Sequence, residues 1–377
     1  GVILVSLATY FLKYRGKWKI LRDRLLMLVS SRGGLCTGIF LMAYFFAIHF
    51  STITIPPEML DFPPMGKIIY FVSFVLFGPH HFSARIAQMV FSLGCCVLVY
   101  LITRLYRDHE TSLIAAGIYI FAPVAFSHGY LADLASGTTF FLLMTAFWFL
   151  KFEKERNLED LLLAMYFIGL GYNYKRPVIY IFIAIWFYWL FFRLRPFSKD
   201  GIREFLWPVL FSWLAVVTVL PGLWLGMNYS DRKFGFVLAH LVNISTLSAY
   251  LRSMQYEITY PIYILFVAGI AWGLLRCRDA WTKYLLAWFG TYYFMFTIFI
   301  YVSYSRYFLY FFPPVAMLAA QGLRYFLNGT NSPKWRAVVV SVLFFYLGFS
   351  NLVEGWMPRS TRWSQSTVNN RERPSPW

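Results

Sequence analysis

The chain has 377 residues, of which 59% are hydrophobic, 21% are aromatic and only 14% are charged. A soluble protein of this length could not bury so much apolar surface, so the composition excludes a soluble globular class and indicates an integral membrane protein. The net charge of +17 would suit a nucleic-acid partner. Its Lys and Arg residues instead stand in short clusters between apolar runs, which is typical of membrane topology and argues against that partner.

The segment 1–33 comes first and is expected to carry no span of its own. Its first twelve residues, GVILVSLATYFL, are apolar, but they are too few to cross about 30 Å of hydrocarbon. No cleavable signal peptide is evident. We therefore predict a cytoplasmic or interfacial segment over 1–33.

Apolar runs of membrane-spanning length follow from residue 34 to residue 353. They predict an all-α, polytopic membrane domain of about eleven transmembrane helices. The expected spans are 34–54, 86–105, 111–128, 134–151, 159–173, 177–194, 205–226, 258–276, 281–302, 306–326 and 335–353. Basic clusters fall on every second connection, among them KYRGKWKILRDR, KFEKER and RLRPFSK, and the positive-inside bias assigns those connections to the cytoplasm.

The apolar run 66–77 is too short to be a further span. A helix of about twelve residues cannot cross a bilayer, and counting it as a span would reverse the sidedness of every later basic connection. We predict an amphipathic helix that lies along the outer membrane face. The tail 354–377 is polar and contains prolines, so we expect a loose segment on the non-cytoplasmic side.

The four cysteines give no sign of a metal centre. They lie in or at the ends of apolar segments without metal-ligand spacing, so they predict neither a zinc site nor a disulfide framework. We expect no cofactor, and the sequence leaves a divalent metal open. The cysteines are Cys36, Cys95, Cys96 and Cys277.

Several ionisable residues fall on the outer connections, against the charge bias, and such residues are functional candidates by default. Asp61 is the most informative, because the rigid Pro-Pro step that follows it would hold a carboxylate in place as a general base. The competing interpretations are a solvated loop acid for Asp61 and snorkelling to lipid headgroups for about half of the charged candidates. Further candidates in the outer connections are Lys67, Arg85, Arg232 and Arg252.

The strongest candidates form two chemical groups. A cationic cluster at a membrane surface can hold a phosphate leaving group, while a carboxylate takes the proton from an incoming hydroxyl. Aromatic residues of the same turns, including Tyr307, could stack on sugar rings, although most of them fit an interfacial aromatic belt. The acids are Asp61, Asp133 and Glu58, and the bases are Lys175, Arg176 and Arg306.

Four segments resemble a known family. DFPPMGKIIYFVSFVLFG, followed by HHFSARIAQMVFSLGCCVLVYLITRLY, is similar to the first outer loop and second span of the GT-C glycosyltransferases. The likeness is to the protein O-mannosyltransferase and lipid A aminoarabinose transferase group, whose loop typically reads D-x-H-P-P-L-G-K. Three further segments agree in order and spacing, AGIYIFAPVAFSHGYLADLASGTTFFLLMTAFWFL, GLGYNYKRPVIYIFIAIWF and SYSRYFLYFFPPVAMLAA. The resemblance covers roughly residues 34–326.

This resemblance implies a polyprenyl-phosphate or dolichyl-phosphate sugar donor, an active site on the outer face and inversion at the anomeric carbon. By position, Asp61 corresponds to the acid of the D-x-x-P-P motif and is expected to act as general base or to orient the acceptor. Asp133 corresponds to a structural or acceptor-side acid. Lys175 and Arg306 are expected to bind the donor phosphate, with Arg176 and Tyr307 beside them. The acceptor would be a lipid, a glycan or a protein.

One departure from the family pattern keeps other functions open. Relatives usually carry an Asp shortly after the first span, whereas AIHFSTITIPPE contains none. Either Glu58 or Asp61 takes the base role, or the chain has lost catalysis and acts as an assembly subunit. A second alternative is a flippase or transporter of a lipid-linked saccharide, for which an inverted repeat would be expected and none is evident.

Overall fold

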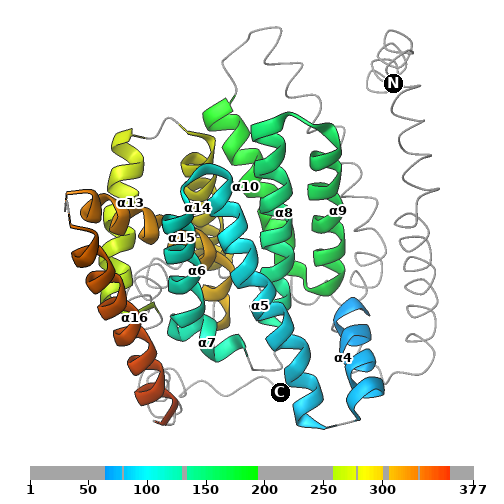
Figure 1. Cartoon of the computed structure of the whole chain (residues 1–377). Coiled ribbons are helices and arrows are strands. Elements are labelled where there is room, and N and C mark those ends of the chain that lie inside the picture. Colours follow the sequence, from blue (N-terminus) through cyan, green and yellow to red (C-terminus); the bar gives the residue numbers. More distant parts are fainter. Residues whose placement is uncertain are drawn as a thin grey trace, which may run out of the picture. The chain divides into compact units, whose positions relative to one another are not determined.

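The computed structural model describes residues 64–78, 80–129, 134–193, 258–276, 279–299, 305–329 and 332–356. The chain divides into two compact units, Gly1–Leu60 and Asp61–Trp377, and every described residue belongs to the second. In this described part all regular elements are helices and no β-strand occurs (Figure 1). The predicted all-α class is confirmed for these residues.

The helices follow one another with short connections. In chain order they are α4 (Pro64–Phe77), α5 (His81–Tyr106), α6 (His109–Phe121), α7 (Pro123–Gly129), α8 (Ala135–Glu155), α9 (Leu158–Tyr174), the 3₁₀ turn η2 (Arg176–Ile179), α10 (Tyr180–Tyr188), the π turn η3 (Trp189–Arg193), α13 (Tyr260–Arg276), α14 (Ala280–Phe299), α15 (Ser305–Asn328) and α16 (Pro333–Trp356).

Most predicted spans on described residues correspond to one helix each, and the span 177–194 corresponds to the run η2, α10 and η3. The short run predicted over 66–77 is also helical, as α4, and its position relative to a membrane stays a prediction. The spans 34–54 and 205–226 and the segment 1–33 lie outside the described residues. The total of about eleven spans therefore also stays a prediction. The loose tail predicted over 354–377 stays a prediction as well, although α16 continues to Trp356.

The span predicted over 111–128 differs from the structure, because it is broken into α6 and α7, which meet at 62°. Ala122 stands at the break with φ −70° and ψ 139°, an extended conformation. Pro123 causes this, since its ring disfavours the α conformation in the preceding residue and it has no N–H to continue the helix. One proline changes the mean hydropathy of the run very little. A prediction based on the length of the apolar run therefore does not detect the break.

Two helices of the described part, Arg85–Tyr106 within α5 and Ala135–Glu155 of α8, are long and apolar enough by themselves to cross a membrane. The bent pair α6 and α7 makes a third if it is counted as one span. Shorter apolar helices cover Ile68–Phe77, Arg176–Phe192 and Tyr260–Leu275. These lengths and compositions fit a membrane-embedded helical bundle.

Direct backbone contact joins α13 to α15. A Cβ atom built on Gly269 would lie 2.0 Å from the carbonyl oxygen of Leu318, and one built on Gly322 would lie 2.3 Å from that of Leu265. No side chain fits at such distances. Small residues at a crossing let two helices approach this closely, and in a membrane such van der Waals contact is a main source of helix association.

Gly269→Ala should therefore destabilise the bundle. The new methyl group meets backbone atoms, which cannot turn away as a flexible side chain would, and overpacking of this kind costs about 1–3 kcal/mol. Thermal unfolding of the purified protein in detergent should show a lower Tm. Gly290→Ala is the matched control, because a Cβ there meets nothing within 4 Å and alanine favours a helix. Equal Tm values for the two variants would contradict the close packing.

Ion pairs tie together the connections at one end of the bundle, which we call the Arg107 end. Nη2 of Arg107 lies 2.7 Å from Oδ2 of Asp279, so the α5–α6 connection is linked to the start of α14. Nη2 of Arg324, near the end of α15, lies 3.1 Å from Oδ2 of Asp108. Burial raises the pKa of Asp279, but the hydrogen bond from Arg107 helps to outweigh it and the pKa stays below its ordinary value. These carboxylates therefore neutralise the cations beside them.

Candidate functional site

The opposite end of the bundle presents two adjacent cations where α9 stops. Tyr174, the last residue of α9, is fully buried, and Lys175 has an extended backbone with φ −159° and ψ 130°. The N–H of Lys175 donates to the Gly171 carbonyl at 2.8 Å. Pro177 prevents the α-helix from continuing through Arg176. Lys175 is half-buried and Arg176 is exposed, so the turn carries two cations at the surface of what we call the Lys175 end.

Two neighbouring helices hold this turn. In α14 the Tyr292 hydroxyl donates to the Pro177 carbonyl at 3.0 Å. In α15 the ring of Tyr310 lies below Lys175, with Nζ 5.7 Å from its centroid, which is within the range of cation–π attraction. Both tyrosine rings are completely buried. The core therefore fixes the position of the turn relative to the beginning of α15.

Aromatic contacts extend from this point to the first turn of α15. The ring of Tyr307 stacks on Phe296 with centroids 4.9 Å apart and an interplanar angle of 12°, and its centroid is 6.0 Å from that of Tyr310. Arg306 directly precedes Tyr307, and the structure describes its backbone within α15. Lys175 and Tyr307, which are far apart in the sequence, are thus joined through one aromatic cluster.

The start of α4 packs at the same end. A Cβ atom built on Gly66 would lie 3.4 Å from the Tyr174 carbonyl oxygen and 3.2 Å from the Leu134 side chain. Leu134 precedes α8 with φ 63° and ψ 4°, a left-handed conformation that costs a residue with a Cβ about 1–2 kcal/mol. Strain of this kind persists only where surrounding contacts impose it. The beginnings of α4 and α8 and the end of α9 therefore meet (Figure 1).

The structure brings together three of the predicted site residues at the Lys175 end, namely Lys175, Arg176 and Tyr307. It also places the backbones of Arg306 and Lys67 in the first turns of α15 and α4. Arg85 is exposed near the start of α5 and makes no hydrogen bond or ion pair with a described residue. The remaining predicted residues lie outside the described residues, and they are Asp61, Glu58, Asp133, Arg232 and Arg252.

Metal ligation is not evident in the described part of the chain. No group of three or more His, Cys, Asp or Glu side chains is placed there to hold an ion. Cys95 and Cys96 are free thiols, the first buried and the second half-buried. The expectation that no metal or cofactor takes part stays a prediction.

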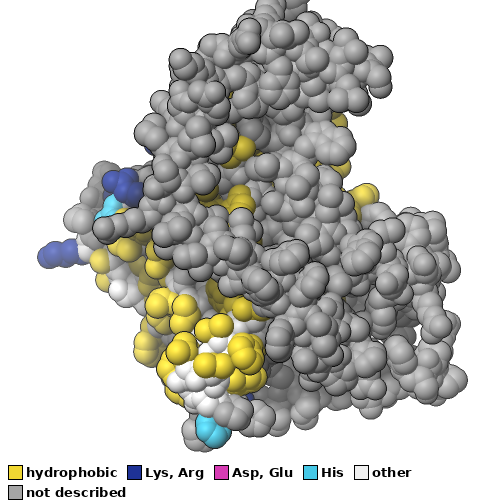
Figure 2. All heavy atoms as spheres, turned by 90° about the vertical axis from the view of Figure 1, so that its right-hand side faces the viewer, with side chains coloured by type: hydrophobic (Ala, Val, Ile, Leu, Met, Phe, Trp, Pro, Cys, Tyr) yellow, Lys and Arg dark blue, Asp and Glu magenta, His cyan; other side chains and the backbone are white. Residues whose placement is uncertain are grey.

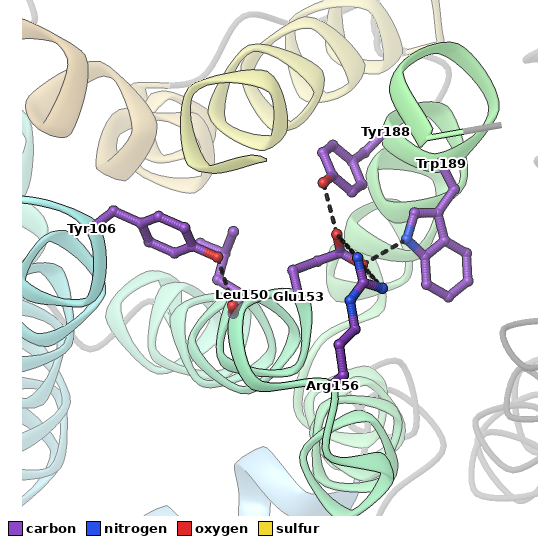
Figure 3. A network of polar contacts seen from close by, with 6 residues as sticks. All are labelled: Tyr106, Leu150, Glu153, Arg156, Tyr188 and Trp189. Atoms are coloured by element: carbon purple, nitrogen blue, oxygen red, sulfur yellow. Dashed lines mark hydrogen bonds and ion pairs between the residues drawn. The ribbon is translucent and has the colours of Figure 1, made fainter. Parts of the chain in front are cut away.

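A buried acid that the sequence did not single out, Glu153, lies near the end of α8 (Figure 3). Its side chain is fully buried and forms a bidentate pair with Arg156 at 3.2 and 3.3 Å. It also accepts hydrogen bonds from the Tyr188 hydroxyl at 2.9 Å and from the Trp189 indole N–H at 3.2 Å. Both oxygens are occupied by donors, so Glu153 fastens α8 to the end of α10 and is not free to act as a base.

α4 turns an apolar face outwards. Phe71, Val75 and Leu76 are 66%, 66% and 68% exposed. Figure 2 shows hydrophobic side chains gathered on the lower part of the described surface, at the height of α4 in Figure 1. These exposed apolar side chains lie on a helix next to the candidate span α5, as expected for a helix that contacts lipid. The predicted position along the membrane face is consistent with this exposure and stays a prediction.

Comparison with known proteins gives matches over the same region. A family model described as dolichyl-phosphate-mannose-protein mannosyltransferase matches residues 61–224, a range that starts at Asp61 and includes the Lys175 turn. The predicted mannosyltransferase YkcB of Bacillus subtilis (strain 168) is 24% identical over 169 residues, which are 43% of this chain and 24% of YkcB.

Solved structures share the arrangement of the helices. ArnT from Cupriavidus metallidurans in the apo state matches with a TM-score of 0.58 and 16% identity over 70% of this chain and 50% of ArnT. ArnT bound to undecaprenyl phosphate gives a TM-score of 0.54, 15% identity, and coverage of 75% and 53%. The Archaeoglobus fulgidus oligosaccharyltransferase in complex with Zn and sulfate gives a TM-score of 0.50, 15% identity, and coverage of 77% and 44%. The chain thus spans about half the length of these structures or less.

The family model, YkcB and the solved structures agree with one another. The matches support the resemblance to the GT-C glycosyltransferases that was inferred from the four sequence segments, and the solved structures show that the chain shares their helical fold.

The arrangement predicts which exposed residues share a side of the membrane. His80 precedes α5 at the Lys175 end, Arg176 belongs to the Lys175 turn, and Lys334 starts α16 close to the Arg107 end, and all three are exposed. In a background that lacks the four native cysteines, His80→Cys and Arg176→Cys should react with a membrane-impermeant maleimide from one side. Lys334→Cys should react from the other side. Labelling of positions 80 and 176 from opposite sides would refute the shared end.

Proposed function

We propose that the chain is a membrane glycosyltransferase that moves a sugar from a polyprenyl-phosphate or dolichyl-phosphate carrier to a lipid, glycan or protein acceptor. The observation that carries the proposal is the contact of Lys175, in the Lys175–Arg176 turn, with Tyr310 near the beginning of α15 at one end of the bundle. ArnT, which has a similar fold, is known in a complex with undecaprenyl phosphate. That complex supports a lipid phosphate as the donor group for this chain as well.

Lys175 and Arg306 are proposed to bind the donor phosphate. Arg306 and Tyr310 are four residues apart, so they share one face of α15 and lie about 6 Å apart along its axis. The ammonium of Lys175 lies over the ring of Tyr310, and the backbone of Tyr310 is about one helical turn from that of Arg306. An arginine fork can bind phosphate oxygens in a bidentate manner, and the lysine adds a compact positive charge. Arg176 and Tyr307 flank these two residues.

Asp61 is proposed as the general base. It precedes Pro64, the first residue of α4, by three residues, and three extended residues span at most about 11 Å. The first turn of α4 packs beside the carboxyl end of α9, and we therefore expect Asp61 to lie within reach of the Lys175 turn. Glu58 is the alternative base, and Asp133 is proposed to act on the acceptor side.

In the proposed step the acceptor hydroxyl oxygen attacks C1 of the sugar from the face opposite the phosphate, while the bond from C1 to the phosphate oxygen breaks. The Asp61 carboxylate takes the hydroxyl proton. Polyprenyl phosphate leaves, and Lys175 and Arg306 stabilise the negative charge that it gains. Attack from this face inverts the anomeric centre. The basic connections at the Arg107 end favour a cytoplasmic position for that end, so we place the reaction on the opposite membrane face.

Two substitutions should separate base catalysis from donor binding. Asp61→Asn removes the proton acceptor and keeps the shape, so kcat should fall by about 10²–10⁴-fold with little change in donor affinity. Lys175→Ala removes a phosphate ligand, so it should weaken donor binding and lower kcat/KM by about 10²–10³-fold, and Lys175→Arg should recover part of this loss. The measurements are sugar release from labelled polyprenyl-phosphate donors by the purified chain and the binding of polyprenyl phosphate.

Lys334→Ala is the matched control, since this exposed lysine stands beyond the opposite end of the bundle and should leave both quantities unchanged. Wild-type donor binding and turnover in Lys175→Ala would remove that residue from the site. A parent protein that is inactive with every donor would favour the assembly-subunit alternative.

A further inference from the structure

A buried amide lies beneath the Lys175 turn. Gln88 in α5 is completely buried, and a polar side chain in such a place is costly unless its hydrogen-bonding groups are paired. Its Nε2 donates to the Tyr70 hydroxyl in α4 at 3.1 Å and to the Tyr174 hydroxyl in α9 at 2.9 Å. Its Oε1 accepts from the N–H of Gly137 in α8 at 3.3 Å. One side chain thus joins α5 to three other helices.

The bond to Gly137 replaces a missing helix cap. The first N–H groups of a helix have no partner within the helix, and Leu134, which stands at the N-cap of α8, has no side-chain oxygen to satisfy them. Gln88 supplies the acceptor from α5 instead. A Cβ atom on Gly137 would lie 2.3 Å from the ring and hydroxyl of Tyr174. Position 137 therefore needs a glycine if the Tyr174 ring is to lie beside it.

The two tyrosine contacts lead to two different parts of the proposed site. Tyr174 is followed directly by Lys175, so a bond that fixes the Tyr174 hydroxyl also fixes where the phosphate-binding turn begins. Tyr70 belongs to α4, the helix that follows Asp61. Restraining Tyr70 therefore restrains the helix to which the proposed base is connected.

We propose that Gln88 is a positioning residue that sets the phosphate-binding turn and α4, the helix that follows Asp61, relative to each other. This inference rests on the proposed function and adds a residue that itself touches no substrate. Gln88 acts through Tyr174 on donor binding and through Tyr70 on proton transfer. A polar group that served only the stability of the bundle would affect neither step selectively.

Removing the Tyr174 and Tyr70 hydroxyl groups one at a time tests whether Gln88 acts on donor binding through Tyr174 and on proton transfer through Tyr70. Tyr174→Phe should raise the KM for the polyprenyl-phosphate donor by up to about tenfold, because the phosphate-binding turn loses a restraint on its position and the energy of one hydrogen bond limits the effect, with kcat within about twofold of wild type. Tyr70→Phe should lower kcat by a similar factor with little change in donor KM. Gln88→Leu should show both defects, and adding Tyr174→Phe to it should raise donor KM no further, because the two residues act through one bond.

Thr103→Val is the matched control in the same helix. Thr103 is buried, and its hydroxyl donates within α5 to the Val99 carbonyl at 2.8 Å, so its loss should lower Tm without changing donor KM or kcat selectively. Hydrogen exchange adds a measurement that needs no activity. The amides of Lys175, Arg176 and Val178 should exchange faster in Gln88→Leu than in Thr103→Val.

The outcomes separate a failure of the proposed function from a failure of the positioning role of Gln88. Absence of sugar transfer by the wild-type protein would overturn the proposed function, while faster exchange at 175–178 in Gln88→Leu would still support the coupling of Gln88 to the turn. Equal exchange and equal kinetics in Gln88→Leu and Thr103→Val would overturn the positioning role. Tyr174→Phe and Tyr70→Phe each remove a single oxygen atom, so unchanged donor KM and kcat in both would overturn it even where Gln88→Leu does not fold.

Discussion

Burial of the Tyr174 ring is the constraint on which the Lys175 end depends. The ring packs against Phe91 and Phe141, with centroids 5.6 and 5.4 Å away, and a side chain at Gly137 would occupy the same space. Because Tyr174 is the last residue of α9, holding its ring also holds the point at which the chain leaves the helix. The packing of Tyr174 in the core thus helps to set the position of the cationic turn that starts at Lys175.

The described contacts of the cations differ between the two ends of the bundle. At the Arg107 end, carboxylates pair with Arg107 and Arg324, so these charges serve to connect helices. At the Lys175 end, Lys175 lies over an aromatic ring and Arg176 makes no ion pair with a described residue. An exposed arginine can bind phosphate oxygens in a bidentate manner, and Arg176 therefore supports the Lys175 end as the proposed site for a phosphate group.

The sequence predicted the described helices well because apolar length adds up along the chain, and the predicted spans within the described residues are helical, with 111–128 divided into α6 and α7. It missed the break at Pro123, since a backbone effect of one residue hardly alters hydropathy. It placed Lys175, Arg176 and Tyr307 on connections at one side, and the structure brings these residues near one another, while their role in a site stays a prediction. It gave no sign of Gln88, because a single polar residue within a span shows its purpose only when α4, α8 and α9 are packed around it. The role of Asp61 as general base beside these cations stays a prediction from its sequence motif.

A structure of the full chain determined with bound polyprenyl phosphate tests the central claim most directly. The account predicts that the phosphate oxygens lie within hydrogen-bond distance of the Lys175 ammonium and the Arg306 guanidinium, with the lipid chain leaving along the apolar surface of the bundle. A phosphate bound at the Arg107 end, or density for the lipid with neither of these cations near its head group, would contradict the account.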